Sequence, residues 1–185
     1  MIRWLFGLAL LPLSASSSGS GREIAIGDPL PRLRGEFLTG RTADLPQAAS
    51  GRVALLLLGF TYDSRFAVEA WGKRFREQFG ADPRVTFYEI PMIGGMARLA
   101  KWFIDSGMRR GTPTADQENV ITVYGGTDAW KQRVAFRDPN AAYLILIDQK
   151  GKVAWRYAGG FSEEPYRALP SEVSRLLGNS SLLSH

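Results

Sequence analysis

One short segment combines residue types and spacing that could support chemistry. Thr61, Asp63, Ser64 and Arg65 follow the apolar run that ends at Phe60, where a strand is expected to give way to a helix. Backbone N–H groups are unpaired at a helix start, so these residues could bind an anion or the carboxylate of a protein partner there. We therefore identify the four residues as candidate binding residues.

Ser64 lacks the neighbours that would make it a nucleophile. A serine hydroxyl attacks only when a base lies within hydrogen-bonding reach. The chain has a single histidine, His185 at its last position, and no Ser-x-x-Lys pattern near Ser64. The simpler interpretation is that Ser64 or Asp63 caps the helix, and we assign no catalytic residue.

A second candidate surface is basic. Four cations and a tryptophan gather along the expected second helix and its exit, opposed only by Asp105: Arg98, Lys101, Trp102, Arg109 and Arg110. Two interpretations remain open. The residues form either a solvated helix face or a surface that contacts an acidic protein partner or an anionic membrane.

The composition excludes several kinds of function. The chain of 185 residues has no cysteine, which excludes disulfides, thiol catalysis and lipid anchoring through a cysteine. With one histidine and no loop of calcium-ligand spacing, we expect no metal, and no phosphate-binding glycine loop or other cofactor motif is present. The net charge of +5 is spread along the chain, which favours solubility over nucleic-acid binding.

Residues 1–17 show the three parts of a secretory signal. Arg3 precedes an apolar run from Trp4 to Leu13, and small residues follow as far as Ser17. The apolar run is too short for the ~20 residues of a membrane-spanning helix. We therefore expect export to the periplasm or the extracellular space. A mitochondrial presequence is the alternative, because the segment is rich in serine and free of acidic residues.

After the signal we expect one folded unit. Residues 18–26 are predicted to be a flexible linker, residues 27–178 a single domain, and residues 179–185 a disordered tail. The hydrophobic pattern predicts strands at 33–38, 41–45, 53–60, 85–90, 120–124, 143–148 and 153–157. It predicts helices at 64–79, from Gly95 to near Gly107, at 127–134, and at 163–177 with a kink or split at Pro170.

This order of elements predicts a three-layer α/β fold with a mixed central sheet, an N-terminal β-hairpin and helices on both faces. The unbroken apolar run at 53–60 is typical of a central strand covered on both sides. Strands that alternate with helices should make the sheet largely parallel. In the helix over 64–79, the spacing places Phe66, Trp71 and Phe75 on the buried face.

The order and several motifs resemble the thioredoxin-like superfamily, and within it the peroxiredoxin-like (AhpC/TSA) branch. The motifs are Gly27-Asp-Pro-Leu-Pro31, Leu146-Ile-Asp148, Gly151-Lys152-Val153 and Gly159-Gly160. Peroxiredoxins carry Pro-x-x-x-Thr-x-x-Cys at the strand-to-helix junction. Here Thr61 keeps its spacing, Ser64 stands in place of the cysteine and Leu57 in place of the proline. The resemblance therefore implies a redox-inactive member.

The second half of the chain also resembles the mitochondrial ATP synthase assembly-factor family. The residues that carry this resemblance are Ser106-Gly-Met-Arg-Arg-Gly-Thr-Pro113, Val123-Tyr124-Gly125, Val153-Ala-Trp155-Arg156 and Gly160-Phe161. That family helps a membrane subunit of the ATP synthase to assemble. The resemblance implies a protein partner of the same kind, a subunit of a membrane complex.

We therefore expect an exported, redox-inactive thioredoxin-fold protein that acts as a protein-binding or assembly module. Two alternatives remain. A thiol-free enzyme on the same fold would need a carboxylate or a lysine beside the hydroxyl of Ser64. A structural envelope domain without a small-molecule site would show an exposed apolar patch near Trp102.

Overall fold

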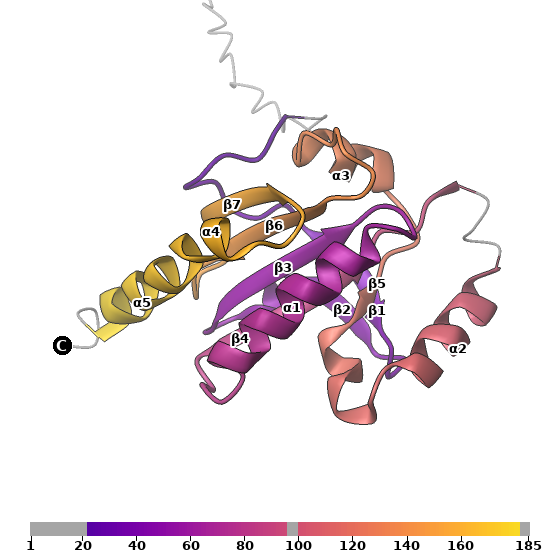
Figure 1. Cartoon of the computed structure of the whole chain (residues 1–185), viewed down its shortest axis with the longest axis horizontal. Helices are drawn as coiled ribbons and strands as arrows, with labels where there is room; N and C mark the ends of the chain where they lie inside the picture. The colour runs from indigo at the N-terminus through magenta and orange to yellow at the C-terminus, as the bar shows by residue number, and fades with distance from the viewer. Residues whose placement is uncertain (1–21, 96–99, 182–185) are drawn as a thin grey trace, which may run out of the picture.

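The computed structural model describes residues 22–95 and 100–181, except for the side chains of Phe103 and of residues 179–181. The predicted signal, Arg98 of the basic surface and His185 lie outside the described residues. The strands are β1 Leu33–Phe37, β2 Thr42–Leu45, β3 Val53–Gly59, β4 Val85–Pro91, β5 Ile121–Thr122, β6 Ala142–Ile147 and β7 Val153–Gly159. The α-helices are α1 Arg65–Phe79, α2 Lys101–Gly111, α3 Thr127–Arg133, α4 Glu163–Tyr166 and α5 Ala168–Ser181, with a 3₁₀ turn at Thr114–Asn119 (Figure 1).

The central sheet has the strand order β4-β3-β6-β7. Strand β3 runs parallel to β4 and antiparallel to β6, and β6 runs antiparallel to β7. The mixed sheet is confirmed, but our expectation that it is largely parallel is wrong. Strand β5 pairs with β1 rather than joining the central sheet as a full strand, and the chain then enters β6 from the opposite end.

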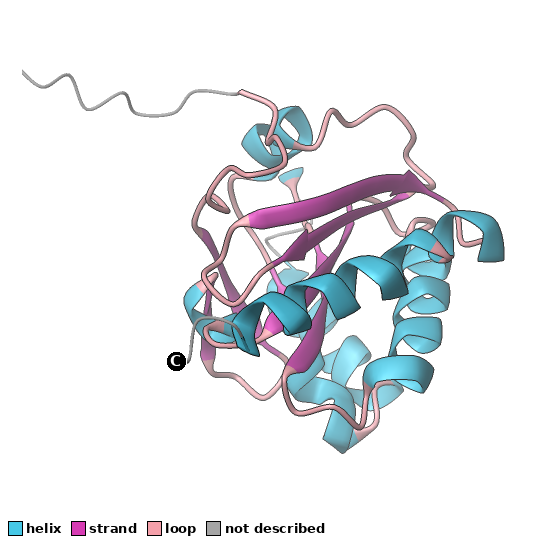
Figure 2. Cartoon of the chain, turned by 90° about the vertical axis from the view of Figure 1, so that its left-hand side faces the viewer, coloured by secondary structure: helices cyan, strands magenta, loops and turns pink. Residues whose placement is uncertain are grey.

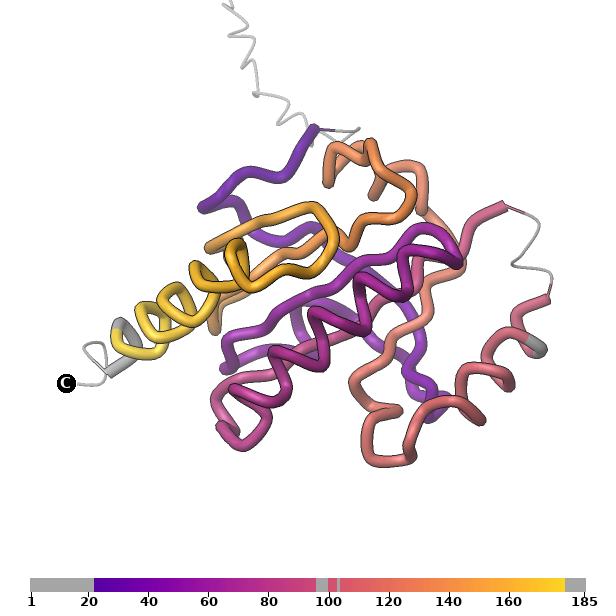
Figure 3. The backbone as a smooth tube through the Cα atoms, viewed as in Figure 1, coloured from indigo at the N-terminus to yellow at the C-terminus, as the bar shows by residue number. Residues whose placement is uncertain are grey.

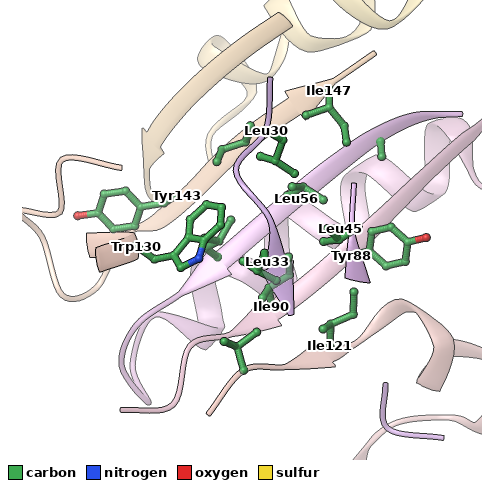
Figure 4. Close-up of a cluster of buried hydrophobic side chains, with 14 of the residues drawn as sticks. Leu30, Leu33, Leu45, Leu56, Tyr88, Ile90, Ile121, Trp130, Tyr143 and Ile147 are labelled. Atoms are coloured by element: carbon green, nitrogen blue, oxygen red, sulfur yellow. The ribbon is translucent and has the colours of Figure 1, made fainter. Parts of the chain in front are cut away.

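The predicted N-terminal hairpin forms and covers one face of the central sheet. Strands β1 and β2 pair antiparallel, and β5 completes a second sheet of order β2-β1-β5. Side chains from both sheets and from α3 meet in a single core (Figure 4). In it Leu33, Leu45 and Ile121 pack with Ile90 of β4 and Trp130 of α3.

Helices α1 and α5 cover the other face of the sheet, and Figure 2 shows helices along one side of the strands. Leu55 and Leu57 of β3 pack there with Trp71 and Phe75 of α1 and Val173 of α5. Every residue of β3 is buried, as the unbroken apolar run predicted. Truncating a buried aromatic residue such as Phe75 to alanine costs about 3–5 kcal/mol, so this layer is a large part of what holds the domain together.

The first turn of α1 departs from the expected pattern. Phe66, which we placed on the buried face, is 59% exposed. Phe66 precedes Trp71 by five positions and Phe75 by nine, which on an α-helix places it roughly 140–180° around the axis from them. Val68 in the same turn is on their side and is buried. The helix therefore presents an aromatic side chain to solvent at its beginning.

The boundaries also differ from those expected. Ile24 is buried and its N–H donates a hydrogen bond to the carbonyl of Arg133 at 2.9 Å, so packing begins within the stretch that we assigned to the linker. The last helix is split at Arg167, before Pro170 rather than at it. Proline is tolerated in the first turn of a helix, where its missing N–H has no partner to lose. Helix α5 then continues to Ser181, beyond the predicted end.

Helix α2 lies at the edge of the molecule opposite the C-terminus (Figure 3). It continues to Gly111, past the expected end near Gly107. Within the described ranges, no helix is long and apolar enough to cross a membrane.

Candidate functional site

Thr61 and Ser64 form a closed hydrogen-bonded turn at the junction of β3 and α1. Ser64 is fully buried. Its Oγ accepts a hydrogen bond from the N–H of Thr61 at 3.2 Å and donates one to the carbonyl of Thr61 at 2.8 Å. In return, the N–H of Ser64 donates to Oγ1 of Thr61 at 3.1 Å. The hydroxyl of Ser64 is thus satisfied by the turn and has no base beside it among these partners.

The same bonds correct our interpretation that a side chain caps α1. Ser64 occupies the N-cap position, but its hydroxyl bonds back to Thr61 and not to an N–H of the helix. Asp63 is exposed, and no described residue hydrogen-bonds its carboxylate in this structure. The N–H groups of Arg65 and Phe66 donate to the carbonyls of the turn, at 3.4 and 3.3 Å. The N–H groups of Arg65 and Phe66 are therefore already engaged at the helix start, where we expected an anion site.

Thr61 is also engaged on its other side. Its Oγ1 donates a hydrogen bond to the carbonyl of Pro139 at 2.5 Å, which ties the junction to the loop before β6. Of the four candidate binding residues, Thr61 and Ser64 therefore stabilise the turn.

Arg65 belongs to an exposed aromatic cluster. Its guanidinium lies 4.0 Å from the ring centre of Tyr62 and 4.5 Å from that of Phe66. Tyr62 is 71% exposed and Phe66 is 59% exposed. We call Tyr62, Arg65 and Phe66 the aromatic rim. A cation held between two rings is preorganised for contact with a partner, because both the rings and the charge stay accessible.

Beside Tyr62 and Arg65 of this rim lies a groove of about 710 Å³, which we call the α1–α2 groove. The start of α1, the end of β4 and the inner side of α2 line it. Val68, Met92, Ile104 and Met108 supply much of its apolar surface. A groove of this size accommodates side chains of a bound segment or a small ligand. The sequence did not predict it, because the groove depends on where α2 packs.

Glu89 is the polar group within this groove. It lies on the face of β4 that Val85 and Phe87 direct toward α1, and its side chain is only 17% exposed. A Cβ atom at Gly72 of α1 would lie 2.5 Å from Oε1 of Glu89, so the helix passes this carboxylate at a glycine. Two signals in the sequence could have revealed the site: a glutamate inside an apolar strand and a glycine inside an amphipathic helix.

Burial raises the pKa of the Glu89 carboxyl to about 7. The charge of Arg76 lowers this pKa in part, and the charges of Glu69 and Asp116 raise it further. The guanidinium of Arg76 lies 4.0 Å from Oε1 of Glu89. It makes its hydrogen bond, 2.8 Å long, to Asp116 instead. Glu89 is therefore a poorly compensated carboxylate, because the nearest described cation is committed to another group.

The basic surface on α2 is smaller than expected. Lys101 forms ion pairs with Asp105 and, at 3.2 Å, with Glu36, so its charge is neutralised within the domain. Arg109 and Arg110 are exposed and form no ion pair with a described residue. Trp102, at the other end of the same helix, is 78% exposed.

A polar cluster connects α2 to the rest of the domain. Asp105 is buried, and the hydroxyl of Tyr124 donates a hydrogen bond to its Oδ1 at 2.6 Å. Burial and this hydrogen bond raise the pKa of Tyr124. Together with Lys101, these residues hold the helix over the end of β5. Across residues 22–95 and 100–181, no three His, Asp or Glu side chains are grouped so that they could hold a metal ion.

Comparisons with known proteins identify the fold. No protein-family pattern matches the chain, and no curated protein matches it. Among solved structures, it is similar to a protein assigned as the thiol:disulfide interchange protein DsbE from Chlorobium tepidum, with 16% identity over 84% of this chain and 99% of that one and a TM-score of 0.56. It is also similar to a thiol peroxidase from Chromobacterium violaceum, with 16% identity over 83% and 90% and a TM-score of 0.53.

A third similar structure is the exposed lipoprotein thioredoxin Etrx1 from Streptococcus pneumoniae, with 15% identity over 77% of this chain and 98% of that one and a TM-score of 0.50. At this level of identity the likeness concerns the fold alone. The names of these neighbours refer to thiol chemistry, whereas the present chain has no cysteine. The chain therefore has a thioredoxin-like fold without a thiol.

Proposed function

We propose that this protein is a thiol-free binding module that holds a segment of a partner protein in the α1–α2 groove. The observation that carries the proposal is the groove itself, with the exposed ring of Tyr62 and the guanidinium of Arg65 at its edge. Aromatic residues and arginine contribute most of the binding energy at protein interfaces. The aromatic rim supplies both kinds of residue beside a preformed hollow.

A binding role also agrees with the state of the junction. The hydroxyl of Ser64 is fully buried and makes two hydrogen bonds to the backbone of Thr61, so it supplies neither a nucleophile nor a free donor. The alternative of a thiol-free enzyme requires a carboxylate or a lysine beside the hydroxyl of Ser64. In the described structure both hydrogen-bond partners of this hydroxyl are backbone groups instead. The surface near Ser64 therefore suits contact with a partner more than catalysis at this serine.

Export and a role in assembling a membrane complex belong to the same proposal. The neighbours include DsbE and a lipoprotein thioredoxin, names that fit an exported protein. The resemblance to the ATP synthase assembly factors suggests the kind of partner, a subunit of a membrane complex. The exposure of Arg109, Arg110 and Trp102 supports contact of this part of the basic surface with an acidic segment of such a partner.

The test is site-specific photo-crosslinking in the native host. A photo-reactive phenylalanine derivative replaces Tyr62 at the rim, and in a control it replaces Ile26, which is 68% exposed and does not line the groove. Crosslinked proteins are identified by mass spectrometry. We expect one discrete partner from position 62 and not from position 26.

A second variant ties the crosslink to the groove. A Cβ atom at Gly107 on the inner side of α2 meets no described atom within 4 Å, so Gly107→Trp can place an indole at the groove. The matched control is Gly178→Trp on α5, a position equally open and outside the groove. Loss of the crosslink with Gly107→Trp alone supports the proposal. An undiminished crosslink with that variant, or none from position 62, overturns it.

The basic surface is tested in the same assay. Reversing both charges with Arg109→Glu and Arg110→Glu should weaken the crosslink if the partner is acidic there. Lys101 is a poor choice for this test, because its replacement would break the ion pairs with Asp105 and Glu36. An unchanged crosslink would show that the α2 surface is only solvated.

A further inference from the structure

We propose that the α1–α2 groove recognises a basic side chain flanked by apolar residues, with Glu89 as the group that binds the lysine or arginine. This inference rests on the proposed function and specifies the chemistry of the partner segment. It follows from the distribution of charge in the groove, which differs from that of the chain as a whole.

The first step is the position of Glu89. Its carboxylate lies within a groove whose surface is otherwise largely apolar, against Gly72 of α1. A half-buried carboxylate in such surroundings is costly unless a cation or a hydrogen-bond donor reaches it. The groove is wide enough for a side chain to enter beside it, so the missing partner can come from another molecule.

The second step is the commitment of the cations nearby. Arg76 approaches Glu89 only to 4.0 Å, while it makes a 2.8 Å hydrogen bond to Asp116. Arg65 also lines the groove, but it stacks on Tyr62 and Phe66. Within the described part of the chain, no other cation approaches Glu89 within 4.0 Å. The carboxylate is therefore left for an external ammonium or guanidinium group.

The third step concerns the surrounding charges. Glu69 of α1 also lines the groove, and Asp116 of the 3₁₀ turn acts on Glu89 with the same sign. Two cations stand against these three carboxylates: Arg65, which stacks on Tyr62 and Phe66 at the edge of the groove, and Arg76 of α1, which is hydrogen-bonded to Asp116. The inner surface is thus acidic in a chain with a net charge of +5. A ligand with an apolar body and a positive end fits both features, as a lysine between leucines does.

The probe is a blocked tripeptide, acetyl-Leu-Lys-Leu-amide, compared with versions that carry norleucine or glutamate in place of lysine. Binding to the full chain, labelled with ¹⁵N, is followed by NMR through the amides of Glu89, Gly72 and Gly107. Norleucine keeps the apolar chain and removes the charge. Because a hydrogen bond to a charged group is worth more than a neutral one, we expect about tenfold weaker binding of the norleucine peptide.

Variants assign the preference to one carboxylate. Glu89→Gln should abolish the difference between the lysine and norleucine peptides, whereas Glu77→Gln, an exposed change on α1 outside the groove, should keep it. The preference should also grow between about pH 6 and about pH 8, as Glu89 ionises. Should Glu89→Gln fail to fold, the peptide comparison in the wild-type chain still decides the matter.

Each result leads to one conclusion. Equal binding of the three peptides, a lysine preference that survives Glu89→Gln, or no response of the groove amides to the lysine peptide overturns this inference. If the peptides bind equally and Gly107→Trp prevents their binding, the groove is a binding site without charge recognition, and the proposed function stands. Failure of the crosslink from position 62 would instead remove the proposed function itself.

Discussion

The raised pKa of Glu89 makes a quantitative prediction for the pH dependence of stability. The perturbation is Glu89→Gln, which keeps the shape of the side chain and removes its titration. In the folded protein, burial raises the pKa of Glu89 from the ordinary 4.5 to about 7. The folded state therefore holds a proton that the unfolded state releases between these two values.

The sign follows from this difference in bound protons. Between about pH 4.5 and about pH 7 the native state binds more protons at this site than the unfolded state, so the free energy of unfolding falls as the pH rises. The stabilisation is fully present below the unfolded pKa and is lost above the folded one. Because each pKa unit corresponds to about 1.36 kcal/mol, the loss reaches about 3 kcal/mol by pH 8.

The assay is urea unfolding of the wild type and of Glu89→Gln at pH values from about 4.5 to about 8. Only the difference between the two curves is interpreted, because an amide in place of the acid changes stability by a constant amount. Working above pH 4.5 also avoids surface groups such as Asp82, whose pKa Arg84 lowers to about 2 and whose stabilisation is lost only in acid. We expect Glu89→Gln to gain about 3 kcal/mol relative to the wild type across this range.

The control is Glu77→Gln, which removes an exposed carboxylate from the same helix layer. Its curve should run parallel to that of the wild type. If the curve of Glu89→Gln is also parallel to the wild type, to within about 0.5 kcal/mol, Glu89 is solvated in the folded protein. That result would refute the burial of the Glu89 carboxyl as the cause of a raised pKa.

Three further predictions concern neighbouring groups. Thr61→Cys should react readily with iodoacetamide because position 61 is exposed, whereas Ser64→Cys, at a fully buried position, should react at least about tenfold more slowly; similar rates would refute the closed turn. Tyr124→Phe removes the hydrogen bond to buried Asp105 and should cost about 1.5–3 kcal/mol in urea unfolding, and a loss below about 0.5 kcal/mol would show that this bond does not hold α2. Gly72→Ala should push the carboxylate of the groove toward solvent and lower its pKa, measured by ¹³C NMR, since the new Cβ would lie 2.5 Å from Oε1; an unchanged pKa would contradict that contact.

The sequence predicted the parts of the fold that depend on local pattern. The unbroken run at β3 indicated a strand buried on both faces, because such a run has no polar side to expose. The hairpin of β1 and β2 was predicted from two short strands that follow each other closely in the sequence. Both features need no information about distant residues.

The departures arise where the outcome depends on distant contacts. Phe66 and Trp71 are both aromatic residues of α1 on different sides of the helix, and only the contacts of the helix with the central sheet decide which side is buried. The pairing of β5 with β1 likewise depends on a contact between remote segments. The role of Glu89 was not predicted for the same reason, because its burial depends on the close approach of Gly72 in α1.

The groups that line the α1–α2 groove differ in whether their bonding capacity is already used. The hydroxyl of Ser64 is bonded to Thr61, and the guanidinium of Arg65 is stacked between two rings. A reactive site needs a nucleophile or a base free to change its bonds, and these residues are held by their own neighbours. The carboxylate of Glu89 and the exposed part of the Tyr62 ring retain capacity for an external group. A groove built in this way suits the proposed recognition of a partner segment, and removing the charge of Glu89 should therefore alter which segment binds.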